Sequence, residues 1–250
     1  MPPIVKSTSL LHWRERAGTL PPVLAEALHA CETQPVAQAE CCDVLDLLGM
    51  LGCDAQTQAA ALWFELARVD PALWKTQGAK LPAELQRLVG GQQAAEQVWA
   101  LHAQRAPEGA AEGLRRLLLA IVRDLRVVFV LLARQLARMR AAATLPPEQA
   151  AALARLTRDI HAPLANRLGI WQLKWELEDL AFRFLQPETY RRIAKLLDER
   201  RTDRESFIRE SLDELQRALE AAGIHAELAG RPKHIYSIWK KMQRKSLDFS

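Results

Sequence analysis

Apolar side chains recur three or four positions apart along most of this 250-residue chain, and that spacing restricts it to a mainly α-helical fold. One such run comprises Ile208, Leu212, Leu215 and Leu219. It places four apolar side chains on one face of a helix. Alanine and leucine are abundant while runs of β-branched residues are rare, which also favours helices. Hydrophobic residues make up 49% of the chain, enough to form a core.

Glycine and proline residues predict where the helices end. Residues 20–70 are predicted to form two or three helices, and a long helix is predicted from about Glu112 to Ala143. Residues 78–113 show little periodicity, which predicts one or two short helices with mobile connections. The predicted breaks are at Pro35, Gly49, Gly52, Gly169, Pro187 and Gly223.

A single strand is predicted towards the end of the chain. Ile224, Ala226 and Leu228 alternate with polar residues, and Gly230 ends the run. One strand cannot form a sheet, and no partner strand is predicted elsewhere in the sequence. We therefore expect a helical domain over residues 1–200. Residues 201–250 are expected to begin an α/β domain whose other strands lie outside this chain.

Charge and cysteine spacing favour a cytoplasmic protein. The net charge of +4 permits an anionic partner without requiring one. The N-terminus lacks the apolar core of a signal peptide, and charged residues interrupt the most apolar segment, Leu117–Ala133, so no membrane segment is expected. The cysteines contain no C-x2-C pair, which predicts reduced, mostly buried thiols rather than a zinc site. They are Cys31, Cys41, Cys42 and Cys53.

The sequence becomes basic after Gly230. Arg231 and Lys233 lie two positions apart, and Ser237 and Lys241 lie four apart on one face of a predicted helix. Arginine, lysine and serine side chains can together bind a polyphosphate, and the N-terminus of the helix adds its own attraction for anions. A solvated basic face is the alternative interpretation.

The string GRPKHIYSIWKKM at residues 230–242 resembles the opening motif of the synthetase domain of the RelA/SpoT family, whose fold is nucleotidyltransferase-like. The resemblance implies that Arg231, Lys233, Ser237 and Lys241 bind ATP. It implies a GTP diphosphokinase of the stringent response, which transfers a pyrophosphoryl group from ATP to the 3′-hydroxyl of GTP or GDP. The family's Mg²⁺-binding Asp and catalytic Glu would lie after Ser250. This chain is therefore expected to contain no catalytic residues and to be inactive as a synthetase.

Upstream sequences resemble the hydrolase domain of the same family. HAPLANRLGI at residues 161–170, followed by WELEDLAF at 175–182, is the most specific match. Residues 52–62 and 123–133 are similar to the segments that lead into the two halves of the hydrolase motif. The resemblance implies a helical HD-type hydrolase domain over residues 1–200.

The residues at the metal-binding positions of that domain have changed. Active hydrolases of this type use His and Asp side chains to hold Mn²⁺, which activates water. Phenylalanine cannot bind a metal, and arginine, a permanent cation, would repel one. We therefore expect a pseudo-hydrolase domain that binds no metal, whereas the complete synthetase domain would use Mg²⁺. The degenerate hydrolase positions implied by the resemblance are Phe64, Glu65, Arg68, Val69, Arg134 and Arg138.

Several roles for such a domain stay open. It could support or restrain the synthetase domain, or Arg134 and Arg138 could bind a regulatory anion in the old pocket. A basic all-α nucleic-acid-binding module is another candidate, although the tryptophans, including Trp63 and Trp171, are interpreted as core rather than as a stacking platform. An active hydrolase with unusual metal ligands is the last alternative. The resemblance further implies ribosome and uncharged tRNA as partners, through C-terminal regions absent here.

Overall fold

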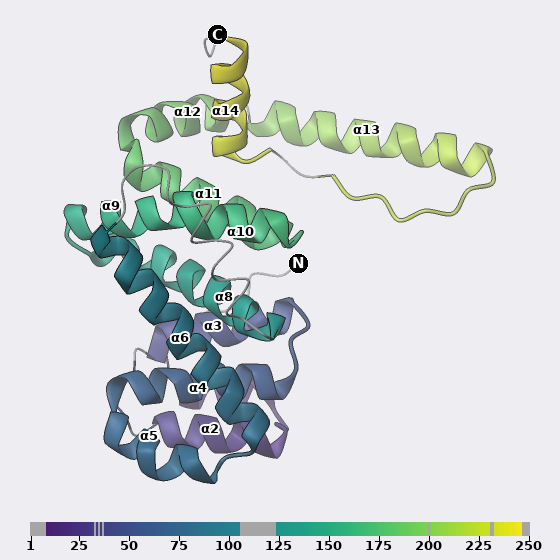
Figure 1. Ribbon diagram of the computed structural model, residues 1–250. Helices are drawn as coiled ribbons and strands as arrows, with labels where there is room; N and C mark the ends of the chain where they lie inside the picture. The colour runs from purple at the N-terminus through teal and green to yellow at the C-terminus, as the bar shows by residue number, and fades with distance from the viewer. Residues whose placement is uncertain are drawn as a thin grey trace. The chain divides into compact units, whose positions relative to one another are not determined.

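The computed structural model describes residues 9–32, 34, 36, 38–105, 124–199, 201–230 and 233–246, and these form helices and connecting segments without any strand (Figure 1). The prediction of a mainly α-helical fold is confirmed. Two compact units divide the chain, Met1–Leu177 and Glu178–Ser250. In the described ranges, no helix has the length and apolarity needed to cross a membrane.

The first unit is a bundle of short and medium helices. They are α1 (Leu10–Ala17), α2 (Pro22–Glu32), α3 (Gln38–Met50), α4 (Ala55–Val69), α5 (Pro71–Gln77), the 3-10 helix η1 (Gly78–Lys80), α6 (Ala83–Arg105), α8 (Leu125–Ala141), the 3-10 helix η2 (Ala142–Thr144), α9 (Pro147–Leu156), the π-helical turn η3 (Thr157–His161), α10 (Ala162–Arg167) and the first part of α11 (Trp171–Leu185).

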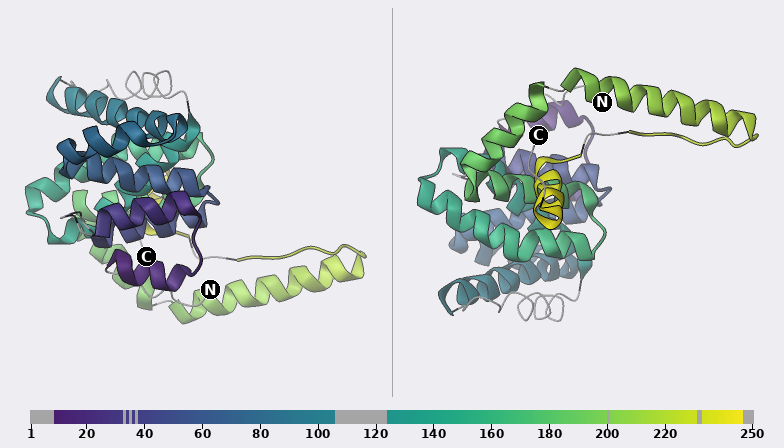
Figure 2. Two further views of the ribbon diagram at one scale, coloured as in Figure 1. Left: turned by 90° about the horizontal axis from the view of Figure 1, so that it is seen from below. Right: turned by 90° about the horizontal axis from the view of Figure 1, so that it is seen from above.

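Helix α4 is the centre of this bundle. It packs against α2, α3, α5, α6 and α8 (Figure 1, Figure 2). Every residue from 59 to 67 is buried, because neighbouring helices surround α4. Asp54 begins the helix by accepting a hydrogen bond from the backbone N–H of Thr57 at 2.7 Å.

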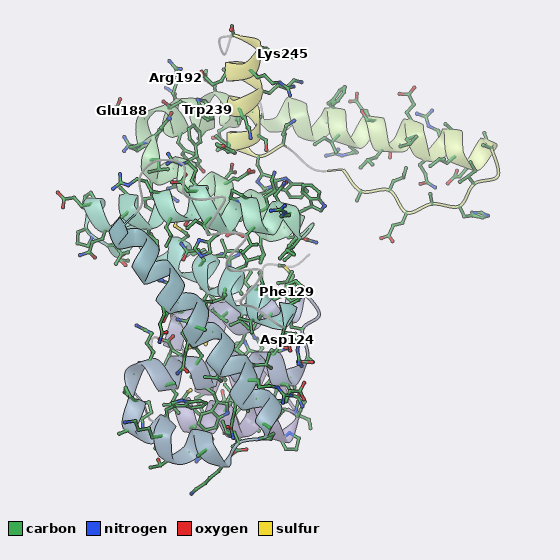
Figure 3. All side chains as sticks on the ribbon, in the orientation of Figure 1. Asp124, Phe129, Glu188, Arg192, Trp239 and Lys245 are labelled. Carbon is green, nitrogen blue, oxygen red and sulfur yellow. The ribbon has the colours of Figure 1, made fainter. Side chains whose placement is uncertain are left out.

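Helix α8 is the second buried helix, and it packs against α3, α4 and α6. Asp124, labelled in Figure 3, is its N-cap and accepts from the backbone N–H of Arg126 at 3.0 Å. The long helix predicted from about Glu112 to Ala143 is observed over Leu125–Ala141. Residues 106–123 lie outside the described part.

The prediction of only short helices over 78–113 was wrong, since α6 runs for 23 residues. Its buried face compensates for the glycines that weakened the sequence pattern.

A π-helical turn, in which Thr157, Ile160 and His161 are buried, joins α9 to α10. Gln135 of α8 donates a hydrogen bond to the hydroxyl of Thr157 at 2.7 Å, and that hydroxyl donates to the carbonyl of Leu153 at 2.8 Å. The last residue of the turn, His161, is fully buried. Burial lowers the pKa of its imidazole to about 3, so the ring is neutral in the folded protein.

The second unit contains the remaining helices. Gly169 in the first unit and Gly223 in the second have positive φ angles and mark helix ends as predicted, and α11 ends two residues before Pro187. After Gly223, the backbone N–H of Ile224 bonds to the carbonyl of Leu219 at 2.9 Å and closes α13. The helices of this unit are the end of α11, α12 (Pro187–Glu199), α13 (Arg201–Ala221) and α14 (Ile235–Lys245).

The strand predicted around Ile224, Ala226 and Leu228 is not formed, and that prediction was wrong. Residues 224–230 are extended but have no regular structure, because no strand among the described residues pairs with them. At the end of this segment, Gly230 lies so close to α13 that an added Cβ would be 2.6 Å from Cγ2 of Ile208. The glycine therefore allows a close approach to α13.

We expect the free energy of unfolding to fall as the pH drops below about 6.5, the ordinary pKa of histidine in an unfolded chain. Below this pH the unfolded state binds a proton at His161 that the folded state excludes until about pH 3. The loss should be about 1.4 kcal/mol per pH unit. Urea unfolding between pH 7.5 and 5.5 measures it. His161→Gln should flatten the pH dependence. His29→Gln, at an exposed position, is the control substitution. Equal pH dependence in wild type and His161→Gln would contradict this account.

Candidate functional site

Four of the six degenerate hydrolase positions converge between α4 and α8. Phe64, Glu65 and Arg68 come from α4, and Arg134 comes from the middle of α8. The other two lie at the margin: Val69 is half-buried at the end of α4, and Arg138 is exposed one turn beyond Arg134. A small pocket adjoins this cluster. It is lined by Glu40, Cys41 and Val44 of α3, Ala61, Leu62 and Glu65 of α4, and Arg134 of α8.

A buried ion pair occupies the centre of the cluster. Oε2 of Glu65 lies 2.9 Å from Nη2 of Arg134, and the two side chains are 5% and 9% exposed. Oε1 of Glu65 accepts from Nε of Arg68 at 3.2 Å and from the same guanidinium's Nη2. The Arg134 guanidinium also lies 4.1 Å from the ring centroid of Phe64, a favourable cation–π position. Its Nη2 is 3.8 Å from Oε1 of Glu96 on α6.

The charges around this pair explain the protonation of its members. Burial acts to raise the pKa of Glu65, but hydrogen bonds from Arg68 and the charge of Arg134 outweigh it and hold the pKa below its ordinary value. Burial lowers the pKa of Arg134, although a guanidinium remains a cation in proteins. Burial raises the pKa of Glu40, and the negative charge of Glu65 raises it further. The cluster therefore holds one firmly ionised carboxylate between two arginines.

This set of side chains does not fit a divalent metal. Of the six positions, only Glu65 carries an atom that could bind Mn²⁺, and arginines occupy both of its oxygens. Mn²⁺ requires several oxygen or nitrogen ligands, and two guanidinium charges beside it would repel it. Across the residues described, no three His, Cys, Asp or Glu side chains are grouped so that they could hold a metal ion.

Sequence reasoning missed two acidic residues at this site. Glu40 belongs to α3 and Glu96 to α6, and both come near Arg134 only through the packing of four helices. No local spacing in the sequence signals such a meeting. The thiols, by contrast, are as predicted: Cys31, Cys41 and Cys42 are buried and free. Burial raises the pKa of Cys31 to about 12, so its thiol is a poor nucleophile at neutral pH.

The predicted nucleotide-binding residues lie at α14 in the second unit. Ser237 is half-buried and Lys241 is exposed one turn later, while Lys233 is exposed just before the helix. Arg231 lies outside the described residues. The predicted attraction of anions by the N-terminus of α14 needs a correction, because the Asp179 carboxylate already accepts the backbone N–H of Tyr236 there at 2.8 Å. A second anion would meet this negative charge.

The interpretation of the tryptophans as core residues is only partly correct. Trp63 is 1% exposed and lies in the core of the first unit. Trp171, at the start of α11, is 47% exposed and stacks on Trp175 at a centroid distance of 6.1 Å. The apolar sequence around Trp171 could not show that the first residue of a helix would face outward.

We expect removal of either member of the buried pair to destabilise the protein strongly. Glu65→Gln leaves the Arg134 guanidinium buried without its direct partner, near only the more distant carboxylates of Glu96 and Glu40. Arg134→Met removes a charge that stabilises Glu65. Breaking a buried ion pair costs about 3–5 kcal/mol, and the double variant Glu65→Leu/Arg134→Met should lose less than the sum of the two singles. Urea unfolding at pH 7 measures these values. Arg158→Met, in an exposed pair, is the control and should change stability by less than about 1 kcal/mol. Additive losses would contradict the pairing.

Comparisons with known proteins agree with this architecture. Residues 23–171 match the HD domain family. The chain is 43% identical over 210 residues to the GTP pyrophosphokinase of Escherichia coli K12, covering 83% of this chain and 28% of that protein. A protein of Synechocystis named a probable guanosine-3′,5′-bis(diphosphate) 3′-pyrophosphohydrolase is 50% identical over 143 residues, covering 57% of this chain and 19% of that protein. The chain thus spans less than a third of the length of these relatives. It belongs to the HD domain family and, within it, to the RelA/SpoT group that these enzymes represent.

Proposed function

We propose that the HD domain of this chain is inactive as a hydrolase and serves as a structural support for a GTP pyrophosphokinase. One observation carries the proposal: both carboxylate oxygens of Glu65 are bound by the guanidinium groups of Arg68 and Arg134. In hydrolases of this type, the metal at this place would activate water against the 3′-pyrophosphate. An arginine has no coordination position to offer a water molecule and cannot release its proton at neutral pH.

The same contacts support a structural role. The Glu65–Arg134 pair joins α4 to α8, and Glu96 extends it to α6. A fixed guanidinium therefore takes the place of an exchangeable metal between these helices. The proposed domain needs no metal to hold its helices together.

The names of the relatives alone do not separate synthetase from hydrolase. The chain is 50% identical to the probable pyrophosphohydrolase over a shorter region and 43% identical to a GTP pyrophosphokinase over a longer one. The distinction therefore rests on the side chains at the old metal site. An active hydrolase with unusual ligands remains the rival that an assay must exclude.

A regulatory anion site in the old pocket has one observation in its favour. Nη1 of Arg134 is buried and has no hydrogen-bond partner among the described residues. However, the space in this pocket is about 10 Å³, roughly room for one water molecule and too small for a phosphate group. Glu40 and Glu65 also line this space, and their charge opposes an anion. We therefore favour the structural role.

Two of the arginines that could give a nucleic-acid-binding module its positive surface, Arg126 and Arg140 of α8, are already paired with carboxylates. Arg126 at the start of α8 pairs with Asp54, Glu84 and Asp124. Arg140 near its end binds Glu176 through two hydrogen bonds of 2.6 and 2.8 Å. These guanidinium groups already face carboxylates, so phosphate backbones would have to displace them.

For the second unit, we propose that Arg231, Lys233, Ser237 and Lys241 bind ATP phosphates in a complete synthetase. Such an enzyme would use Mg²⁺ to spread the phosphate charge while ATP donates a pyrophosphoryl group to GTP or GDP. The name of the Escherichia coli relative supports this reaction. Cytoplasmic location, and ribosome and uncharged tRNA as partners through regions C-terminal to this chain, belong to the same proposal.

We expect the purified chain to leave guanosine tetraphosphate intact in the presence of Mn²⁺, because the donor set cannot hold the metal. Anion-exchange chromatography of the nucleotide over time measures the loss. The Synechocystis relative, under identical conditions, serves as the reference for hydrolysis. Steady release of pyrophosphate that stops on addition of a chelator would contradict the proposal.

A second assay tests the nucleotide site. We expect Lys241→Ala to weaken binding of Mg²⁺–ATP about tenfold, since one charge-assisted phosphate contact is lost. Isothermal titration calorimetry at low ionic strength measures the change. Lys195→Ala, which removes an exposed lysine of α12, is the matched control and should have little effect. Equal effects of the two variants would indicate nonspecific attraction rather than a site.

A further inference from the structure

Among the residues that the structure describes, the N-cap residue of α14 does not cap the helix with its own side chain. His234 occupies the N-cap position, but its side chain makes no capping hydrogen bond to the helix. The first backbone N–H groups of any helix need partners from outside the helix. In α14 that partner comes from far away in the sequence, since Asp179 of α11 lies 57 residues before Tyr236.

Both oxygens of the Asp179 carboxylate are engaged at this helix end. Oδ1 accepts the backbone N–H of Tyr236 at 2.8 Å, and Oδ2 lies 3.3 Å from Nδ1 of His234. The Asp179 side chain is only 18% exposed, which limits competition from water. One carboxylate therefore holds the N-cap residue and the second residue of the helix together.

An aromatic cluster fixes α14 at a second point. Phe182, three residues after Asp179 on α11, lies 4.7 Å from Trp239 and 5.8 Å from Tyr236 between ring centroids. Tyr190 of α12 packs against the same phenylalanine at 6.0 Å. Trp239 is labelled in Figure 3 on α14, which packs beside α12. A polar contact at the N-terminus and an aromatic contact one turn later fix both the position and the rotation of the helix.

Helical spacing then decides which face of α14 remains available. Tyr236 and Trp239 face α11, so Ser237 and Lys241 lie on the other side of the helix, where Lys241 is exposed. A change in the rotation of α14 would move both side chains relative to Lys233, which precedes the helix.

We propose that Asp179 is a positioning residue for the nucleotide site: by capping α14 it sets where Ser237 and Lys241 meet the phosphates of ATP. This inference rests on the ATP-binding role proposed above for these residues. Asp179 itself does not contact the nucleotide. It acts through the backbone of Tyr236 and through His234, which are held before any ligand arrives.

The test combines hydrogen exchange with ATP binding on the whole chain. Asp179→Ala should speed amide exchange in the first turn of α14 about fivefold, the effect of losing one helix cap, and leave α8 unchanged. It should also weaken binding of Mg²⁺–ATP about fivefold without lowering the unfolding temperature of the first unit. Asp179→Asn, which keeps an acceptor for the Tyr236 N–H, should recover most of both losses. Asp213→Ala on α13 removes an exposed carboxylate from the same unit and should change neither.

Different results overturn different claims. Unchanged exchange in Asp179→Ala would refute the cap and with it the positioning role. Faster exchange with unaltered ATP affinity, while Lys241→Ala still weakens binding, would refute the positioning role and leave the proposed ATP site intact. Absence of ATP binding in the wild-type chain would refute the proposed site itself, and the inference would fall with it.

Discussion

The buried ion pair between Glu65 and Arg134 is the interaction on which the first unit depends. It lies where α4 and α8, the two most buried helices, approach each other, and both partners are almost inaccessible to water. In a site from which water is excluded, each charge requires its partner, because leaving one buried ion unpaired destabilises the protein by several kcal/mol. Arg68 and Phe64 complete the surroundings of the pair by binding its remaining carboxylate oxygen and by stacking beneath its guanidinium. A change at Glu65 or Arg134 therefore affects the packing of α4 against α8.

The two units use charge in different ways. In the first, most basic side chains of α8 face acidic partners, as Arg126 and Arg140 do, so the positive charge of this helix is neutralised locally. In the second, Lys233 and Lys241 remain exposed around α14, while a carboxylate caps the end of that helix. Basic residues therefore stabilise the fold in one unit and stay accessible to a ligand in the other.

Much of this architecture was predictable from local sequence, and the failures have physical reasons. Gly169, Pro187 and Gly223 marked helix boundaries correctly because backbone conformation is a local property. The alternation of apolar and polar residues at 224–228 led to a wrong prediction of a strand. Such alternation is compatible with a strand, but a strand forms only where a partner strand can pair with it. At the candidate site, resemblance to the family pointed to Glu65 and Arg134. Glu40, Glu96 and Asp179 could not be found that way, because they reach their partners only through tertiary packing.

Binding of Mn²⁺ to the purified chain is the measurement that tests the central claim most directly. Electron paramagnetic resonance detects free Mn²⁺, whose signal disappears when the ion binds to protein. We predict that the signal stays at its protein-free intensity as the chain is added, because arginines occupy the only carboxylate at the old metal position. Loss of the signal in proportion to the protein, abolished by Glu65→Ala, would mean that the site still holds a metal and that the ion pair has not replaced it.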